Sequence, residues 1–200
     1  RRFDRIVLDV RPIAQPDPTT FADALVDAVR QLGIDVLPWT DALRQWRERV
    51  RCLREWLPDD EAATLPDLSD AALLATLDDW LKPALRGKRR LDALTEQELT
   101  DALKSGTDWS TRQKIDALAP ARIGVPSGLE RAIHYAHDAS PVLAVKLQEL
   151  FGLADTPRIA NGRVPLTLHL LSPGGRPLQV TQDLKGFWER TYPEVKKEMK

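Results

Sequence analysis

Cysteine, methionine and long apolar runs are almost absent from this chain of 200 residues. The single cysteine, Cys52, cannot form a disulfide within the chain, which is typical of a reducing compartment, so we expect a cytoplasmic location. No stretch approaches the roughly 18 apolar residues of a membrane span, and no signal peptide leads the chain, so no membrane partner is expected. Because the chain starts at Arg1 and its one methionine is Met199, we expect it to be a piece of a longer protein.

A strong excess of one charge is also missing. The chain has 29 basic and 30 acidic residues, which leaves a net charge of −1. Any surface that binds nucleic acid must therefore be a local patch rather than the field of the whole molecule. A hydrophobic content of 42% and a charged content of 30% are ordinary for a globular protein of one domain or two small ones.

Motifs for nucleotide binding and for hydrolysis are absent. The phosphate-binding loop Gly-x-x-x-x-Gly-Lys-Ser/Thr does not occur, so we expect no cofactor in this chain. A triad of Ser172, His169 and Asp183 can be drawn on paper, but no Gly-x-Ser-x-Gly turn accompanies it. Ser172 stands before Pro-Gly-Gly and is interpreted as a turn residue. We therefore expect no catalytic residue here.

Two histidines three residues apart, His134 and His137, invite a metal site. That spacing suits one face of a helix, but here it lies at the end of an expected strand, where the two side chains point to opposite faces. The third histidine, His169, falls in a different strand. The interpretation is that these histidines are hydrogen-bonded or solvent-facing, and that no metal is bound.

Hydrophobic periodicity predicts an α+β fold with an N-terminal strand, a helical middle and a C-terminal region of a helix plus a β-hairpin. The strand is expected over Arg2–Ile13. The helical middle is expected to contain five helices. The first is Pro18–Leu32, capped by Asp17, with an apolar face of Phe21, Leu25, Val29 and Leu32. The others are a helix capped by Thr40 and ended by Pro58, one capped by Ser69 that runs to Leu81, one that begins at the capping box Thr95–Glu98, and a short one that begins at Ser110–Gln113, with the stretch 59–67 as a loop.

The pattern changes after Pro120, where glycine and proline mark turns. The expected elements are a strand over Leu129–Ala136, a helix starting at Pro141, strands over Val164–Leu171 and Pro177–Thr181 joined by a Pro173-Gly-Gly turn, and a closing helix capped by Asp183. The boundary near Pro120 therefore separates a helical part from an α+β part.

Basic residues gather in two places. Arginines recur at spacings of three, four and three along the second expected helix, at Arg44, Arg47, Arg51 and Arg54. A continuous stripe of this kind can follow a phosphate backbone, although Glu48 and Glu55 are spaced to pair with it as an ordinary solvated or inter-domain face. The second place is a loop between helices that carries Arg86, Lys88, Arg89 and Arg90, for which phosphate contact and a solubilising role both stand as interpretations.

Six tryptophans are many for this length. Trp46 and Trp80 fall at core positions of helices, and Trp188 follows Phe187 in the closing helix. Trp39 and Trp109 stand close to helix starts, where packing across the first turn is common. We expect all of them to pack in the core or between domains.

The longest distinctive pattern lies in the last sixty residues. It includes Ser140–Leu153, Gly162–Pro165, Leu171–Pro173, Arg176–Asp183 and Phe187–Trp188, and shorter stretches in the middle of the chain accompany it at Leu32–Trp39, Trp80–Pro83, Trp109, Ile115–Pro120 and Val125–Gly128. Together these stretches resemble the C-terminal region of the bacterial DEAH-box, ATP-dependent RNA helicases of the HrpB type. The resemblance covers nearly the whole chain.

The resemblance implies an organisation and a set of partners. Residues 1–13 would end an upstream OB-like β segment, residues 14–120 would form a helical subdomain, and residues 121–200 would form the α+β C-terminal subdomain. The implied partner in cis is the helicase core, which would hold ATP and Mg²⁺. The implied role is that of an accessory region, itself not an enzyme, which supports RNA binding or braces the core. The alternative is a docking module that recruits a protein partner.

Overall fold

The computed structural model describes residues 2–3, 6–7 and 18–198 of the chain. Strands β1 (Arg2–Phe3) and β2 (Ile6–Val7) pair antiparallel, with Phe3 opposite Ile6. The expectation of one continuous strand is therefore wrong where it can be checked, because β1 and β2 run in opposite directions. The rest of the expected strand and the expected Asp17 cap lie outside the described residues.

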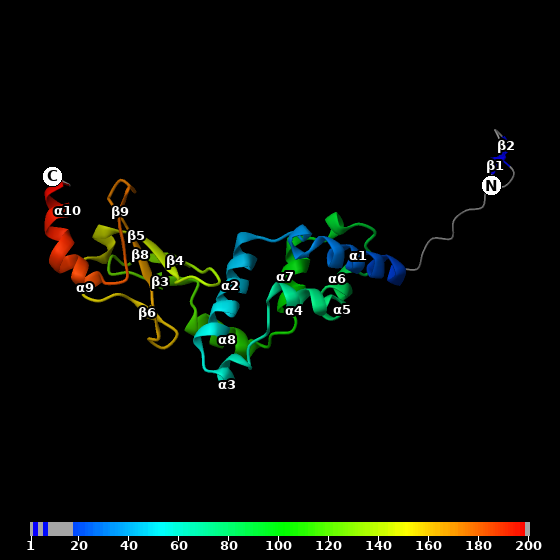
Figure 1. Ribbon diagram of the computed structural model, residues 1–200, viewed down its shortest axis with the longest axis horizontal. Coiled ribbons are helices and arrows are strands. Elements are labelled where there is room, and N and C mark those ends of the chain that lie inside the picture. The colour runs from blue at the N-terminus through cyan, green and yellow to red at the C-terminus, as the bar shows by residue number, and fades with distance from the viewer. Residues whose placement is uncertain (1, 4–5, 8–17, 199–200) are drawn as a thin grey trace.

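Helices fill residues 18–118, which we call the helical half (Figure 1). Its elements are α1 (Pro18–Leu32), η1 (Ile34–Val36), α2 (Asp41–Trp56), α3 (Asp59–Ala62), α4 (Asp70–Ala75), α5 (Leu77–Trp80), α6 (Lys82–Leu85), η2 (Leu91–Ala93), α7 (Glu96–Lys104) and α8 (Trp109–Leu118). The five helices expected in this half are present, although the one from Ser69 is interrupted at Thr76. No helix within residues 18–198 has the length and apolar character needed to cross a membrane.

Side-chain hydrogen bonds cap the starts of α2, α4, α7 and α8. The hydroxyls of Thr40 and Ser69 accept from the backbone N–H groups three residues on, at 3.1 and 3.2 Å. The capping box of Thr95 and Glu98 is complete in both directions. The cap of α8 is Asp108 rather than the expected Ser110, because the Asp108 carboxylate accepts from the Thr111 N–H at 2.6 Å.

Other details differ from expectation in the helical half. The buried face of α1 consists of Ala22, Val26 and Val29, and this helix lies against α5 and α6, while Leu32 is 65% exposed. The stretch 59–67 begins with α3, whose acidic first turn suits the positive end of a helix dipole. The helix from Ser69 breaks at Thr76, whose hydroxyl donates to the Ala72 carbonyl at 2.8 Å.

Residues 122–198, which we call the sheet half, hold a mixed five-stranded sheet in the order β3-β4-β5-β8-β9. Its elements are β3 (Arg122–Gly124), β4 (Glu130–His134), β5 (Val142–Lys146), η3 (Leu147–Leu150), β6 (Arg158–Ile159), β7 (Val164–Pro165), β8 (Thr167–Leu171), β9 (Pro177–Thr181), α9 (Leu184–Gly186), the π-helical turn η4 (Phe187–Thr191) and α10 (Tyr192–Glu198). The predicted β8–β9 hairpin and its Pro173-Gly-Gly turn are confirmed. The predicted strand over Val164–Leu171 is split into β7 and β8.

The helix expected from Pro141 is instead strand β5 followed by the single turn η3. Burial alternates along β5, with Leu143 and Val145 inside, and the strand runs parallel to β8. Over so short a run, β-branched and aliphatic side chains fit the pattern of a helix as well as that of a strand. Here the pairing with β8 makes the segment a strand. The buried carboxylate of Glu149 in η3 accepts two hydrogen bonds from Arg131 on β4, at 2.8 and 2.5 Å, and thereby holds η3 against the sheet.

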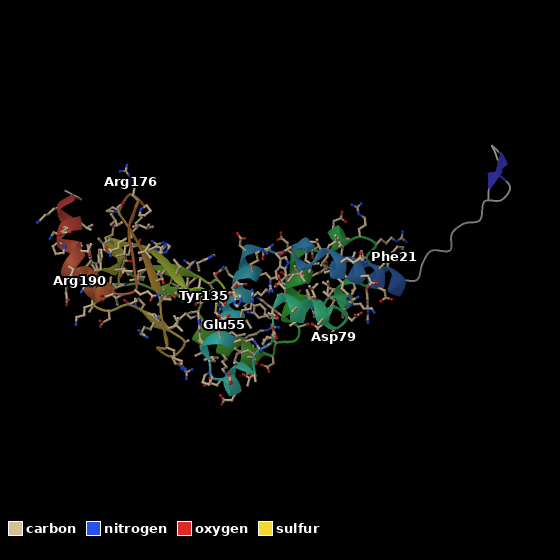
Figure 2. The ribbon with its side chains drawn as sticks, viewed as in Figure 1. Phe21, Glu55, Asp79, Tyr135, Arg176 and Arg190 are labelled. Carbon is tan, nitrogen blue, oxygen red and sulfur yellow. The ribbon has the colours of Figure 1, made fainter. Side chains whose placement is uncertain are left out.

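The two halves meet along α2. In Figure 1 this helix stands between the sheet and the other helices, and Figure 2 places Glu55 of α2 near Tyr135, the residue that follows β4. Gln45 accepts from the N–H of Tyr135 at 2.8 Å and donates to its carbonyl at 3.1 Å. The Tyr135 ring lies 6.3 Å from that of Trp56, and its hydroxyl donates to the Pro120 carbonyl at 2.6 Å. One cluster of buried apolar residues runs through both halves.

Candidate nucleic-acid interface

The four arginines predicted as a stripe on α2 do not share one environment. The apolar side of the helix buries Leu43, Trp46, Val50 and Leu53, and the arginines flank it at different depths. Arg44 is exposed, Arg51 and Arg54 are half-buried, and Arg47 is 8% exposed. The stripe is therefore continuous in sequence spacing but not on the surface.

Arg47 is an internal connector. Its Nε donates to the Leu68 carbonyl at 2.7 Å, its Nη2 pairs with the carboxylate of Asp70, and its guanidinium lies 5.5 Å from the centre of the Trp39 ring. The hydrogen bond from Arg47 lowers the pKa of Asp70. Through these contacts Arg47 joins α2 to the start of α4.

Two further arginines of α2 are also engaged within the protein. Arg54 donates to the carbonyls of Leu65 and Ala62, at 2.6 and 3.3 Å, and so closes the segment that follows α3. Arg51 pairs with Glu48 at 3.0 Å. Arg44 is more open to solvent, because its side chain is 48% exposed. Its Nη1 lies 3.7 Å from Oδ1 of Asp35, and its guanidinium lies 5.7 Å from the Trp39 ring centre.

The loop 86–90 presents its cations more openly. Arg86 is exposed, and its side chain makes no hydrogen bond or ion pair with the described residues, while the side chain of Arg90 is 76% exposed and pairs with Asp92. The guanidinium of Arg89 lies 5.9 Å from the ring centre of Phe21 on α1. Lys88 is the exception, since it donates to the Ala93 carbonyl and to Glu98, at 2.9 and 2.8 Å.

Lys88 acts on the start of α7. Its hydrogen bond to Glu98, together with those from the backbone and hydroxyl of Thr95, lowers the pKa of Glu98 to about 2. The lysine is thus part of the capping structure of α7 and holds the loop to that helix. Of the eight predicted contact residues, Arg44, Arg86, Arg89 and Arg90 are exposed to solvent.

Arg49, which is a second buried arginine of α2, was not singled out from the sequence. It is 6% exposed, donates to the Ala119 carbonyl and pairs with Asp116 of α8, both at 2.5 Å. Its position, one turn from Trp46 and from Leu53 on the apolar side of α2, indicates from the sequence that the side chain is buried. The packing expected for Trp109 is wrong, because that side chain is 75% exposed.

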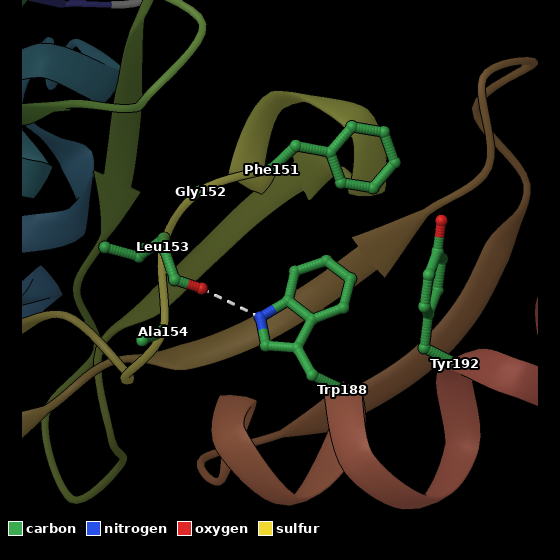
Figure 3. Close-up of a pocket in the computed structure, with 6 residues that line it drawn as sticks. All are labelled: Phe151, Gly152, Leu153, Ala154, Trp188 and Tyr192. Atoms are coloured by element: carbon green, nitrogen blue, oxygen red, sulfur yellow. Dashed lines mark hydrogen bonds between the residues drawn. The ribbon is translucent and has the colours of Figure 1, made fainter.

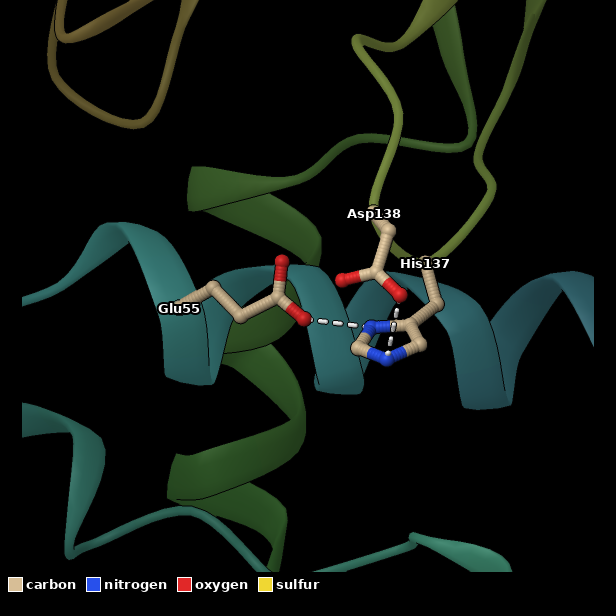
Figure 4. Close-up of side chains that lie close together, drawn as sticks. All are labelled: Glu55, His137 and Asp138. Atoms are coloured by element: carbon tan, nitrogen blue, oxygen red, sulfur yellow. Dashed lines mark ion pairs between the residues drawn. The ribbon is translucent and has the colours of Figure 1, made fainter.

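His137 takes part in the densest group of possible metal ligands in the described part of the chain. Nitrogen or oxygen atoms of Glu55, His137 and Asp138 lie within 4.8 Å of one another, and all three residues are exposed. Figure 4 shows the imidazole between the two carboxylates: Nδ1 faces Glu55, and Nε2 lies 3.1 Å from Asp138. Each ring nitrogen thus meets one carboxylate, and these two contacts tie α2 to the β4–β5 turn.

Ser172, His169 and Asp183, which could form a triad by residue type, each have other neighbours in the structure. The Ser172 hydroxyl accepts from the Arg176 N–H at 3.0 Å within the β8–β9 turn. Asp183 accepts from the Gly186 N–H and pairs with Arg190, both at 2.8 Å. His169 lies on β8 beside Val180 of β9. These are turn, cap and strand positions, so Ser172, His169 and Asp183 do not form a triad.

The comparisons with known proteins agree with one another. A family profile described as "ATP-dependent helicase C-terminal" matches residues 80–200. The chain is 42% identical over 199 residues to the ATP-dependent RNA helicase HrpB of Escherichia coli K12, covering 100% of this chain and 24% of that protein. It is thus similar to about a quarter of that relative's length.

Two solved structures have the same fold. The crystal structure of the E. coli DExH-box NTPase HrpB matches with a TM-score of 0.85 and 43% identity, over 96% of this chain and 23% of that one. The crystal structure of the E. coli DEAH/RHA helicase HrpB matches with a TM-score of 0.80 and 42% identity, over 98% of this chain and 24% of that one. The predicted resemblance and the α+β fold class are confirmed, and the chain belongs to the family of ATP-dependent helicase C-terminal regions.

Proposed function

We propose that this chain is an accessory region that extends the RNA path of an ATP-dependent helicase. The observation that carries the proposal is the loop 86–90, where Arg86 and Arg90 hold their charges in solvent beside Arg89. The E. coli relative is named as an RNA helicase, which makes RNA the polyanion to consider. With a net charge of −1, the chain can attract a phosphate backbone only through such a local patch.

The roles of the predicted contact residues divide accordingly. Arg86, Arg89 and Arg90, together with Arg44, are proposed to contact phosphates. Arg47, Arg51, Arg54 and Lys88 support the fold, since each is bound to a carbonyl or a carboxylate of the protein. An exposed arginine can exchange its surface partner for phosphate at little cost, whereas a buried one must leave a carbonyl unpaired.

The test is salt-dependent binding of a fluorescently labelled single-stranded RNA to the 200-residue chain. The double variant Arg86→Ala/Arg90→Ala should bind more weakly, and the slope of log K against log salt should fall by about 0.7 for each lost contact. The matched control is Arg176→Ala/Lys197→Ala, which removes the same charge from exposed sites in the sheet half (Figure 2 shows Arg176 at the turn). Equal weakening by both variants, or no binding at low salt, would refute the proposal.

We further propose that ATP hydrolysis belongs to the remainder of the helicase. Phosphate-binding loops need glycine-rich backbone followed by lysine, and residues 1–200 contain no such run. ATP and Mg²⁺ would accordingly be held outside this chain. A rate of phosphate release from ATP that rises in proportion to the concentration of the purified chain, and survives repeated purification, would contradict this assignment.

The second candidate function is docking to the helicase core, and a different feature favours it. Phe151, Trp188 and Tyr192 stand around a cavity of about 340 Å³, shown in Figure 3. Their ring centres are 5.1–6.1 Å apart, and Phe151 is 51% exposed. The Trp188 N–H donates to the Leu153 carbonyl at 2.8 Å, which fixes the indole in the wall of this cavity. Such a cavity suits an apolar side chain of a protein.

Since the chain matches about a quarter of its relative, the proposed occupant is the remaining part of the same helicase. Phe151→Ala should weaken co-elution of the chain with the separately expressed remainder by about tenfold, as expected for one aromatic anchor. Val180→Ala, an exposed apolar residue of β9, serves as the control. Unchanged co-elution of the Phe151 variant would rule out this cavity as the docking site.

A further inference from the structure

Trp109 is unlike the other five tryptophans of the chain. Trp46 is buried, and Trp39, Trp56, Trp80 and Trp188 pack against the hydrophobic core. Three of these also donate their indole N–H to a carbonyl, at 2.7–3.0 Å. Trp109, at the first position of α8, is 75% exposed and has no ring contact or hydrogen bond from its side chain among the residues that the structure describes. A tryptophan exposed to this extent is uncommon, and it offers a bare aromatic face to a ligand.

Two cations lie close to Trp109 in the chain, Arg112 on α8 and Lys104 at the end of α7. Arg112 lies one turn further along α8, a spacing that puts its side chain beside that of Trp109. The guanidinium donates to the carbonyls of Lys104 and Thr107, at 2.6 and 2.9 Å, and is thereby held in place. The Lys104 ammonium lies 5.0 Å from the ring centre of Trp46.

Neither cation is closely paired with a carboxylate in the described part of the chain, although the charges of Asp116 and Asp101 also act on Lys104. Within the described residues neither Lys104 nor Arg112 forms an ion pair with a carboxylate. Burial, followed by the charge of Arg112, lowers the pKa of Lys104, as expected where two positive charges share a poorly solvated place. Asp108, the acid that precedes Trp109, turns its carboxylate toward the Thr111 N–H to cap the helix. An anion that met both cations would therefore relieve their repulsion.

We propose that Trp109, Arg112 and Lys104 form a contact for single-stranded RNA, in which a base stacks on the indole and an adjacent phosphate meets the two cations. Stacking on an aromatic side chain next to a positive groove is the general mode of single-strand binding. An apolar protein surface is a poorer match, because the ring is flanked by the polar residues Asp108 and Ser110 rather than by other apolar side chains. The inference depends on the proposed RNA function but uses residues outside the loop 86–90.

The test compares two labelled strands of about 12 nucleotides, a length within single-strand binding sites, one of oligoadenylate and one abasic. Trp109→Ala should weaken binding of the 200-residue chain to oligoadenylate by about 5-fold to 100-fold, and Trp109→Phe should restore most of it. Affinity for the abasic strand should not change, because no base is available to stack. Lys104→Gln should weaken binding to both strands and lower the salt slope by about 0.7.

Control measurements distinguish a failure of the stacking contact from a failure of the proposed RNA function. Leu32→Ala, another exposed apolar residue, should bind oligoadenylate like the unaltered chain, and circular dichroism should show that all variants are folded. If Trp109→Ala binds oligoadenylate normally while Arg86→Ala/Arg90→Ala does not, the stacking contact is refuted and the proposed function stands. If the unaltered chain binds neither strand at low salt, both are refuted. If Trp109→Ala loses only its association with the remainder of the helicase, the ring is a protein contact and the inference is wrong.

Discussion

Gln45 pairs with the backbone of Tyr135 as a neighbouring strand would. Its carboxamide accepts from the Tyr135 N–H at 2.8 Å and donates to the Tyr135 carbonyl at 3.1 Å. One side chain of a helix thus satisfies both polar groups of a buried residue at the end of β4. The sheet half is held to the helical half through this pairing, and the two ion pairs of His137 lie beside it.

Removing this carboxamide should destabilise the whole chain. Gln45→Ala leaves a buried N–H and carbonyl unpaired, so we expect the free energy of unfolding to fall by about 1–3 kcal/mol. Urea denaturation followed by circular dichroism measures the change. Gln113→Ala, an exposed glutamine of α8, should change the stability by less than about 0.5 kcal/mol. A Gln45 variant as stable as the Gln113 control would show that water replaces the pairing without loss.

Arg47 and Arg44 should respond oppositely in stability and in RNA binding. Arg47→Ala leaves the buried Leu68 carbonyl without its partner and should cost about 1–3 kcal/mol of stability. Arg44→Ala removes only an exposed arginine and should cost less than about 0.5 kcal/mol while weakening RNA binding. Thermal denaturation and the RNA titration described above measure both. Similar stabilities of the two variants would contradict the burial seen for Arg47.

Glu98 should contribute to acid unfolding. Because Lys88 and Thr95 lower its pKa from 4.5 to about 2, its stabilising effect is fully present above pH 4.5 and is lost as the pH falls toward 2. Glu98→Gln cannot titrate, so its urea midpoint should fall less steeply than that of the unaltered chain over this interval. Glu96→Gln on the same helix is the control. Parallel curves for the Glu98 variant and the unaltered chain would refute the assignment.

The thiol of Cys52 should be unreactive in the folded chain. Burial, with smaller contributions from Glu55 and Glu48, raises its pKa to about 12, and the side chain is 1% exposed. Since the thiolate is the reactive form, modification by an aromatic disulfide reagent near pH 8 should proceed only as the protein unfolds. Adding denaturing urea should accelerate it at least about 100-fold. Rapid stoichiometric labelling without urea would mean that α2 opens readily.

Features set by near neighbours in the sequence were predictable. The capping box of Thr95 and Glu98 and the Pro173-Gly-Gly turn each depend on residues that are close in the chain. Features set by distant partners were not. The strand character of β5 comes from β8, and the burial of Arg47 comes from a carbonyl and a carboxylate more than twenty residues away. Spacing placed Arg47 and Arg44 on one stripe, but only tertiary contacts distinguish a structural arginine from an exposed one.

The parallel pairing of β5 with β8 constrains the order in which the chain folds. The helical half depends largely on contacts between neighbouring helices, whereas β5 must wait for residues 147–166 to be made and looped back before β8 can join it. Closing such a loop costs entropy before any contact compensates for it. We expect helices to form first, during synthesis, and the central strands of the sheet to pair last. Until then Leu143 and Val145 stay exposed, so slow synthesis beyond β5 would favour aggregation.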